Sequence, residues 1–132
     1  MFDVGSIVEK EAQKLELMHP QTGAPVGASI ELAGSGHPKR RKLEMEHARK
    51  LRVRVSRRGR IEFPDPVEDE EYEIDRLVVC TLSWEGVARD GHPIPCTPEE
   101  IRELYTSAAW IRRQAIAFLD DSANFVQSTG GD

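Results

Sequence analysis

Residues 84–100, WEGVARDGHPIPCTPEE, constrain the fold most strongly, because they dictate where the chain stops, turns and starts again. Gly86 can end an incoming helix in the left-handed conformation that glycine adopts without strain. Asp90 and Gly91 are typical of a tight reversal, and two prolines then restrict the returning path. We predict that Trp84 ends the incoming helix as a large core anchor.

The last four residues of this segment, TPEE, predict the start of a new helix. Thr97 can cap the helix while Glu100, at the third helical position, reaches back to it, which is the capping-box arrangement. Trp84 is then expected to pack against the returning segment or against Tyr105. We interpret the following residues as a structural corner: Trp84, Gly86, Asp90, Gly91 and Thr97.

A catalytic reading of the same segment rests on Cys96 and His92, which could form a nucleophile–base pair. Pro93 and Pro95 lie between them and prevent the two from sharing a helical face, and no acid or oxyanion donor stands beside them in sequence. The other histidines and the second cysteine are scattered without metal-ligand spacing, and phosphate-binding glycine loops are absent. We therefore expect no enzymatic activity, no cofactor and no metal.

Residues 14–33, KLELMHPQTGAPVGASIELA, predict a β-hairpin. Leu15 and Leu17 alternate with polar residues, and so do Ile30 and Leu32 on the other side of a turn rich in glycine and proline. A lone hairpin is marginally stable in water, so this one should dock on the helices or pair with a neighbouring strand.

Apolar spacing predicts four helices after the hairpin. The first begins at Pro38 and extends to near Arg57, and the second begins in the following acidic stretch and ends at Trp84. The last two cover residues 99–107 and 108–125.

The sequence as a whole thus predicts a mainly α fold, with an N-terminal β-hairpin followed by a small bundle of about four helices. We divide the chain into an arm and hairpin (1–36), a helical domain (37–125) and a flexible tail (126–132). The absence of a long apolar stretch and the presence of only two cysteines lead us to expect a soluble intracellular protein without a membrane partner.

The net charge of −5 conceals two adjacent blocks of opposite sign. Residues 37–60 contain eleven Lys or Arg and two Glu, whereas residues 61–75 contain eight Asp or Glu and no basic residue. Such blocks can attract each other within or between subunits. We predict oligomer contacts through these residues: Arg40, Arg41, Lys42, Glu68, Glu70 and Glu71.

The basic segment 38–60 also supports an alternative hypothesis, in which the chain is a nucleic-acid-binding accessory protein. Against it, the segment lacks interleaved aromatic residues, matches no nucleic-acid-binding motif, and is followed by an acidic block that would compete with phosphate.

The order of features resembles that of the tail assembly chaperones of long-tailed, siphophage-type bacteriophages. The resemblance runs from about residue 14 to 125 and rests on HPQTGAPVGASIELAG before the basic helix, on SWEGVARDGHPIPCTPEEIRELY, and on WIRRQAIAFLDDSANF. It implies a non-enzymatic, mostly helical protein that binds the tape measure protein, keeps it soluble and helps recruit the tail tube protein.

The same resemblance implies self-association into rings or spirals, action in the cytoplasm of the infected bacterial host, and absence from the finished virion. A minor structural protein of the virion remains a further alternative. Amphipathic helices can offer apolar stripes to a partner helix, although the same side chains can also form the monomer's own core. The candidate partner-binding residues are Leu43, Leu51, Val55, Trp110, Ile111, Phe118 and Phe125.

Overall fold

The computed structural model describes residues 1–58 and 66–128, without the side chains of residues 54–58. Its helices are α1 (Pro38–Arg58), α2 (Pro66–Cys80), α3 (Pro98–Ser107) and α4 (Ala109–Asp120). Its strands are β1 (Ile7–Glu9), β2 (Ala12–Met18), β3 (Pro25–Ala33), β4 (Thr81–Glu85), β5 (Ala88–Arg89), β6 (His92–Pro93) and β7 (Val126–Ser128). The fold is therefore an α+β mixture, and the predicted mainly α fold is wrong.

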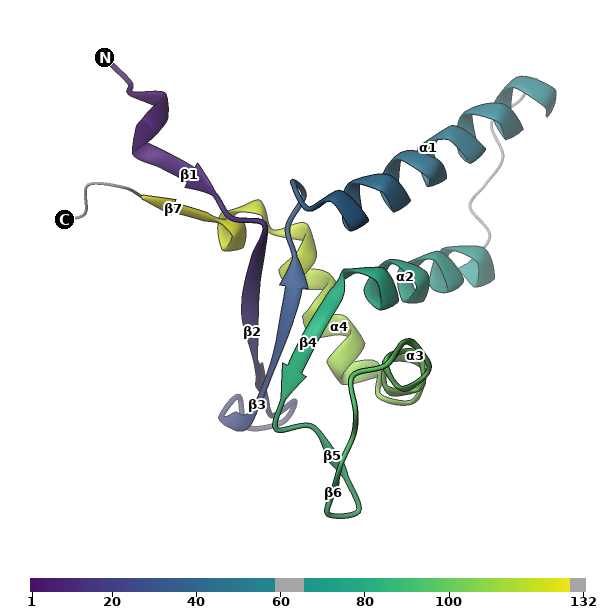
Figure 1. Cartoon of the computed structure of the whole chain (residues 1–132). Helices are drawn as coiled ribbons and strands as arrows, with labels where there is room; N and C mark the ends of the chain where they lie inside the picture. Colours follow the sequence, from purple (N-terminus) through teal and green to yellow (C-terminus); the bar gives the residue numbers. More distant parts are fainter. Residues whose placement is uncertain (59–65, 129–132) are drawn as a thin grey trace.

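A three-stranded antiparallel sheet in the order β2-β3-β4 forms the centre of the molecule (Figure 1). Leu15, Ile30 and Trp84 lie side by side across it. One face packs on helices, while the other carries polar side chains such as Lys14 and Glu85, which form an exposed ion pair at 3.5 Å. The predicted hairpin is confirmed as β2 and β3, because alternating apolar residues place one buried face on the core.

Strand β4 is the largest departure from the predicted bundle. The helix expected to end at Trp84 ends at Cys80, and Thr81 begins a strand that pairs with β3. The helical apolar spacing through Thr81 and Leu82 suggested a longer helix, but Leu82 and Trp84 also alternate like strand residues. Pairing with β3 favours the strand over the helix, because the backbone groups along that edge of β3 would otherwise lack hydrogen-bond partners.

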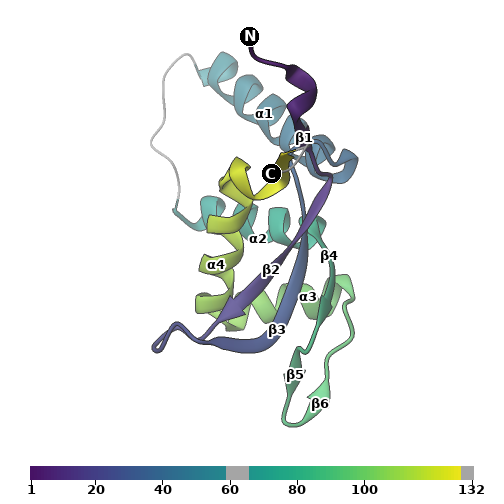
Figure 2. The same ribbon diagram turned by 90° about the vertical axis from the view of Figure 1, so that its left-hand side faces the viewer.

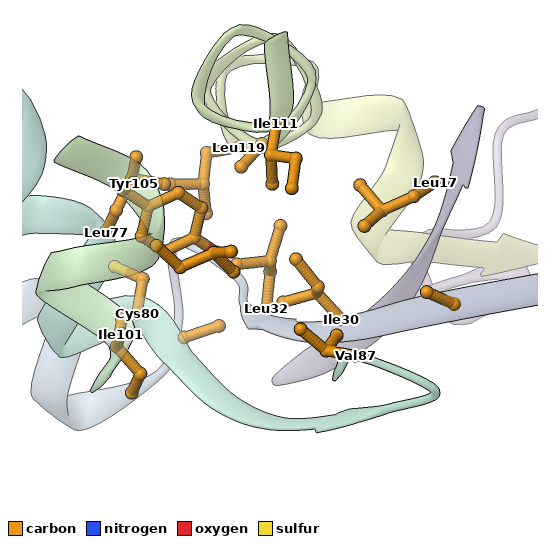
Figure 3. Close-up of a cluster of buried hydrophobic side chains, with 14 of the residues drawn as sticks. Leu17, Ile30, Leu32, Leu77, Cys80, Val87, Ile101, Tyr105, Ile111 and Leu119 are labelled. Carbon is orange, nitrogen blue, oxygen red and sulfur yellow. The ribbon is translucent and has the colours of Figure 1, made fainter. Parts of the chain in front are cut away.

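Helices α2, α3 and α4 cover one face of the sheet, as the strands crossing in front of α2 and α3 in Figure 2 show. Tyr105 lies at the centre of this core and is fully buried (Figure 3). Its hydroxyl is 2.8 Å from the Thr81 hydroxyl, which satisfies both polar groups inside the core. The other fully buried large side chains are Leu17, Ile30, Leu32, Leu77, Leu119 and Cys80.

The two ends of the described chain pair with each other. Strand β1 runs antiparallel to β7, with Val8 opposite Gln127, and the amide of Lys10 donates to the Phe125 carbonyl at 2.6 Å. Residues Val126–Ser128 belong to the segment that the sequence assigns to a flexible tail, yet here they form a strand. Figure 1 shows this ribbon extending from the body near both termini.

Candidate interaction surfaces

Helix α1 contacts the body near its start and extends away from it toward its end, diverging from α2 (Figure 1). Pro38 occupies its first turn, where the missing amide hydrogen costs no helical hydrogen bond. The two ends of α1 therefore meet different surroundings, and we describe the anchored end first.

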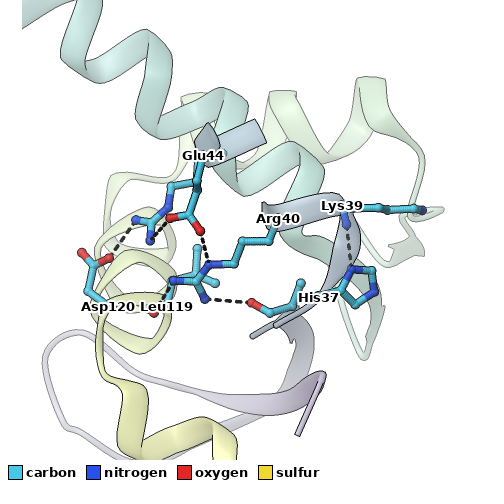
Figure 4. A network of polar contacts seen from close by, with 8 residues as sticks. His37, Lys39, Arg40, Glu44, Leu119 and Asp120 are labelled. Atoms are coloured by element: carbon cyan, nitrogen blue, oxygen red, sulfur yellow. Dashed lines mark hydrogen bonds and ion pairs between the residues drawn. The ribbon is translucent and has the colours of Figure 1, made fainter. Parts of the chain in front are cut away.

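Arg40 anchors α1 to the body through its guanidinium, which donates three hydrogen bonds of 2.9 Å (Figure 4). The acceptors are the Glu44 carboxylate and the backbone carbonyls of Ala33 and Leu119. The residue is only 5% exposed, and its guanidinium carbon lies 5.8 Å from the ring centre of Phe125. A planar fork with five donors suits this task, which a lysine could not perform equally.

Glu44 extends the anchor to α2, because its second oxygen lies 3.4 Å from the Arg76 guanidinium. Arg76 in turn bonds Asp120 at the end of α4 at 2.8 Å. Burial alone would lower the pKa of Arg76, but the hydrogen bond and charge of Asp120, together with Glu44, raise it above its ordinary value. The cation therefore persists, and the four residues tie α1, α2 and α4 together.

His47 is the last anchored residue along the inner side of α1. Its ring stacks on that of Tyr72 in α2, with centroids 3.5 Å apart and planes 8° from parallel. Burial, followed by the charge of Glu44, raises the pKa of the Tyr72 hydroxyl. The phenol is therefore neutral at physiological pH, and the contact is a ring stack between the two helices.

Beyond His47 the same side of α1 is exposed. Leu43 is half-buried and His47 is stacked, but Leu51, which continues the four-residue spacing, is 45% exposed. Val55 is the next position, and its side chain lies outside the described residues. We call Leu43, His47 and Leu51 the inner stripe of α1.

The exposed surface of α1 outside the inner stripe is mainly basic. The exposed cations in the described part of the helix are Lys39, Arg41, Lys42, Arg49, Lys50 and Arg52, and the exposed carboxylate of Glu46 lies among them. Met45 is 55% exposed among them. Sequence reasoning missed Met45, although its spacing of four residues from Arg41 and from Arg49 would have placed it with them on a helical wheel.

The predicted partner residues outside α1 are mostly turned inward. Ile111 and Phe125 are buried at 7% and 4% exposure and belong to the core. Trp110 and Phe118 are half-buried against that core, and the Phe118 ring meets the edge of Phe125 at 5.4 Å. In this chain these side chains serve its own packing.

The residues predicted as oligomer charge contacts include one buried residue and five exposed ones. Arg40 is inside the anchor, whereas Arg41 and Lys42 are exposed on the basic side of α1. The acidic members Glu68, Glu70 and Glu71 are exposed at the start of α2. Of these, Glu70 lies 3.5 Å from the Arg112 guanidinium, and the Glu70 side chain is 57% exposed.

The predicted corner keeps most of its geometry. The Trp84 indole donates to the Ile94 carbonyl at 2.8 Å, which confirms packing on the returning segment, and Thr97 accepts from the Glu100 amide at 3.3 Å. Asp90 and Gly91 both have positive φ and join β5 to β6 in a two-residue reversal. These features form a corner between strand β4 and helix α3, whereas the sequence predicted a corner between two helices.

Gly86 also has positive φ, but it follows strand β4 and ends no helix. A side chain there would collide with the backbone carbonyl of Gly27, so glycine is needed for close approach as well as for conformation.

His92 and Cys96, the residues weighed as a nucleophile–base pair, lie in different surroundings. His92 is exposed in strand β6, while Cys96 is half-buried before α3. Burial raises the pKa of the Cys96 thiol, which disfavours the reactive thiolate. Within the described ranges, no group of three or more His, Cys, Asp or Glu is placed to hold a metal ion.

The ribbon of β1 and β7 forms a second exposed apolar surface. The exposed large side chains of the two strands are Ile7, Val8 and Val126, and Met1, Phe2 and Val4 are exposed in the residues just before β1. Ile7 and Val8 are adjacent in β1, so their side chains face opposite sides of the ribbon, and each is 47% exposed. Both faces are thus available for contact.

No protein-family model, curated protein or solved structure matches this chain. None of the described helices is long and apolar enough to cross a membrane.

Proposed function

We propose that this chain is a non-enzymatic tail assembly chaperone of a long-tailed bacteriophage. It binds the tape measure protein, keeps that protein soluble and helps recruit tail tube subunits. It acts in the cytoplasm of the infected bacterial host and is absent from the finished virion.

The observation that carries the proposal is the increase in side-chain exposure along the inner stripe of α1. Leu43 and His47 face the body, but Leu51 is 45% exposed at the same helical position two turns later. An amphipathic helix of a partner can cover such a position by laying its own apolar face along the stripe. The tape measure protein, as a long helical and apolar chain, is a partner of this kind.

Two of the sequence features that support the resemblance have definite structural roles. Gly23 in the TG-x-P turn has a φ of +74°, and the corner after β4 sets the path into α3. The mixed α+β fold departs from the mostly helical one that the resemblance implies. The proposal therefore rests on the exposed part of α1 and on the order of these motifs.

Co-expression with a long, coiled-coil-rich phage tape measure protein tests the proposal directly. We expect the wild-type chain to raise the soluble yield of the tape measure protein, and Leu51→Glu to lose most of that gain. Ser83→Glu, which adds the same charge on the open face of the sheet, is the matched control. No gain in soluble tape measure protein with the wild-type chain would refute the proposal.

A second candidate function, binding of nucleic acid, is favoured by one observation. Six cations in the part of α1 with described side chains are exposed, and phosphate contacts from such side chains give binding that weakens steeply with salt. Titration with duplex DNA at low and near-physiological salt tests it: tight binding at the higher salt would replace the chaperone proposal. Detection of the chain in purified virions would instead identify a minor structural protein.

A further inference from the structure

The ribbon of β1 and β7 is joined to the body at its base, where the amide of Lys10 donates to the Phe125 carbonyl at 2.6 Å. Beyond this point the two strands pack mainly on each other. Among the described strands, β7 alone pairs with β1, so the other edge of β1 has no neighbour (Figure 1). A two-stranded ribbon is marginally stable in water and gains stability from a third strand.

The hydrogen bond at the base shows which backbone groups of β1 face β7. Glu9 lies opposite Val126, and the bond donated by the next residue, Lys10, makes them a non-hydrogen-bonded pair. The alternation of an antiparallel ladder then turns the amide and carbonyl of Val8 toward β7. The amides and carbonyls of Ile7 and Glu9 face the outer edge, where an added strand can bond them.

The side chains of β1 favour the same kind of partner. Ile7 and Val8 are apolar on opposite faces and 47% exposed, a pattern typical of strands that are covered on both faces. Glu9 is exposed and shares the face of Ile7. A strand beside β1 can bury apolar side chains next to Ile7 and Val8, and a Lys or Arg opposite Glu9 would complement its charge.

We infer that the outer edge of β1 binds an extended segment of a partner protein that carries two adjacent apolar residues beside a Lys or Arg. The segment adds to the ribbon as a third strand. Backbone hydrogen bonds with Ile7 and Glu9 provide affinity, and the Glu9 carboxylate selects the basic residue. This inference is independent of tape measure binding, which uses the inner stripe of α1.

A second copy of the chain fits this edge less well than a basic segment does. Antiparallel pairing of two β1 edges centred on Val8 would place each Glu9 opposite Ile7 of the other copy, without a charge partner. A shift in register would place the two Glu9 side chains opposite each other, and like charges in that position are destabilising. The exposed acids Asp3 and Glu9 also oppose the approach of a polyanion such as nucleic acid.

Titration of the nitrogen-15-labelled full chain with a synthetic peptide, followed by NMR, tests the inference. The probe is the capped peptide Thr-Lys-Val-Val-Lys-Thr, which presents a basic residue beside two apolar ones in either chain direction. We expect the amide signals of Ile7 and Glu9 to shift and their hydrogen exchange to slow, while the amide signal of Leu77 in α2 stays unchanged. A control peptide with Glu in place of both Lys should bind at least about fivefold more weakly.

Two substitutions at Glu9 separate the backbone contribution from that of the charge. Glu9→Pro removes an amide that faces the outer edge, so the ribbon still forms but binding of the lysine peptide should fall at least about tenfold. Glu9→Gln retains that amide and should weaken binding by about two- to fivefold. An unchanged amide signal of Gln127 in each variant shows that β7 remains paired.

Four outcomes overturn the inference. The first is an absence of shifts at Ile7 and Glu9 with the lysine peptide at about 5 mM. The second is equal binding by Glu9→Pro and the wild type, which would place the peptide away from this edge. The third is equal binding of the lysine and glutamate peptides, which would remove the role of charge. The fourth is an oligomer in light scattering that Glu9→Pro dissociates, which would assign the edge to a second copy.

Discussion

Arg40 and Arg41 are adjacent residues of the same type with opposite surroundings. Arg40 is 5% exposed and donates to a carboxylate and two backbone carbonyls, whereas Arg41 is exposed on the outer side of α1. The rotation of about 100° between successive helical residues separates them. A basic block in a sequence therefore contains residues of two kinds, those that hold the fold and those available to a partner.

The same contrast holds along the helix. Near its start, α1 is fixed by Arg40, Glu44 and His47, while Met45 and Leu51 are exposed to solvent. Stability should therefore depend on the anchored end, and binding should depend on the exposed side chains. The following variants test that division.

The largest expected effect comes from Arg40→Ala. It leaves the carbonyls of Ala33 and Leu119 without their side-chain donor in a buried site and leaves Glu44 with Arg76 as its remaining ion-pair partner, so the free energy of unfolding should fall by about 3–5 kcal/mol. Urea unfolding measures this change. Arg41→Ala is the matched control and should stay within about 0.5 kcal/mol of wild type; similar losses in the two variants would remove the distinction between them.

The next effect concerns pH, through the buried Cys80 thiol near the anchor. Burial raises the pKa of Cys80 from 9.0 to about 11, although the charges of Arg40 and Arg76 lower it in part. Because the folded-state pKa is the higher one, the stabilisation is complete below about pH 9 and is lost as pH rises toward 11. A shift of this size corresponds to about 2–3 kcal/mol.

Unfolding measured from about pH 8 to pH 9 follows the start of the Cys80 effect before the tyrosines of the unfolded chain, with a pKa near 10, ionise appreciably. Cys80→Ala should remove the decline in this range, while Cys96→Ala should largely retain it. A wild-type chain whose stability does not change over that range would contradict the buried position of the thiol.

The ring stack of His47 on Tyr72 should contribute less. A double-mutant cycle with His47→Ala and Tyr72→Ala should give a coupling of about 0.5–1.5 kcal/mol, the range for aromatic pairs. Urea unfolding of the four proteins yields the coupling. A value near zero would mean that α1 is held by the Arg40 and Glu44 contacts without help from the stack.

The smallest effect on stability is expected at Leu51. Leu51→Ala should change the free energy of unfolding by about 0.5 kcal/mol or less, because the side chain is already 45% exposed. Leu77→Ala, in the core, should cost about 2–5 kcal/mol by comparison. A large loss at Leu51 would show that the position is covered within the monomer, and it would argue against its role as a partner contact.

Local signals in the sequence were sufficient for several elements. The hairpin, the helix start at Pro38, the Thr97 cap and the reversal at Asp90 and Gly91 depend on neighbouring residues, and each is confirmed. Strand β4 was predicted wrongly as helix, because its residues fit both periods and pairing with a strand fifty residues earlier decided the outcome. The β1–β7 pairing joins opposite ends of the chain and left no local signal.

For the candidate surfaces, the sequence predicted contacts on α1 but did not separate the buried side chains of that helix from the exposed ones. It placed Arg40, Arg41 and Lys42 together as oligomer contacts, although only the last two are exposed. It also placed Phe125 among partner contacts, while the structure uses that ring in the core. Apolar residues at the end of a chain look alike in sequence whether they meet their own core or another protein.

The sequence by itself determined the turns, the caps and the division of charge, because each depends on residues close together along the chain. Only the tertiary structure decided which cations are buried, which strand completes the sheet and how the termini meet. Those outcomes depend on backbone groups and carboxylates brought close from distant segments, since a buried charge or an unpaired edge is stable only where such partners are in reach.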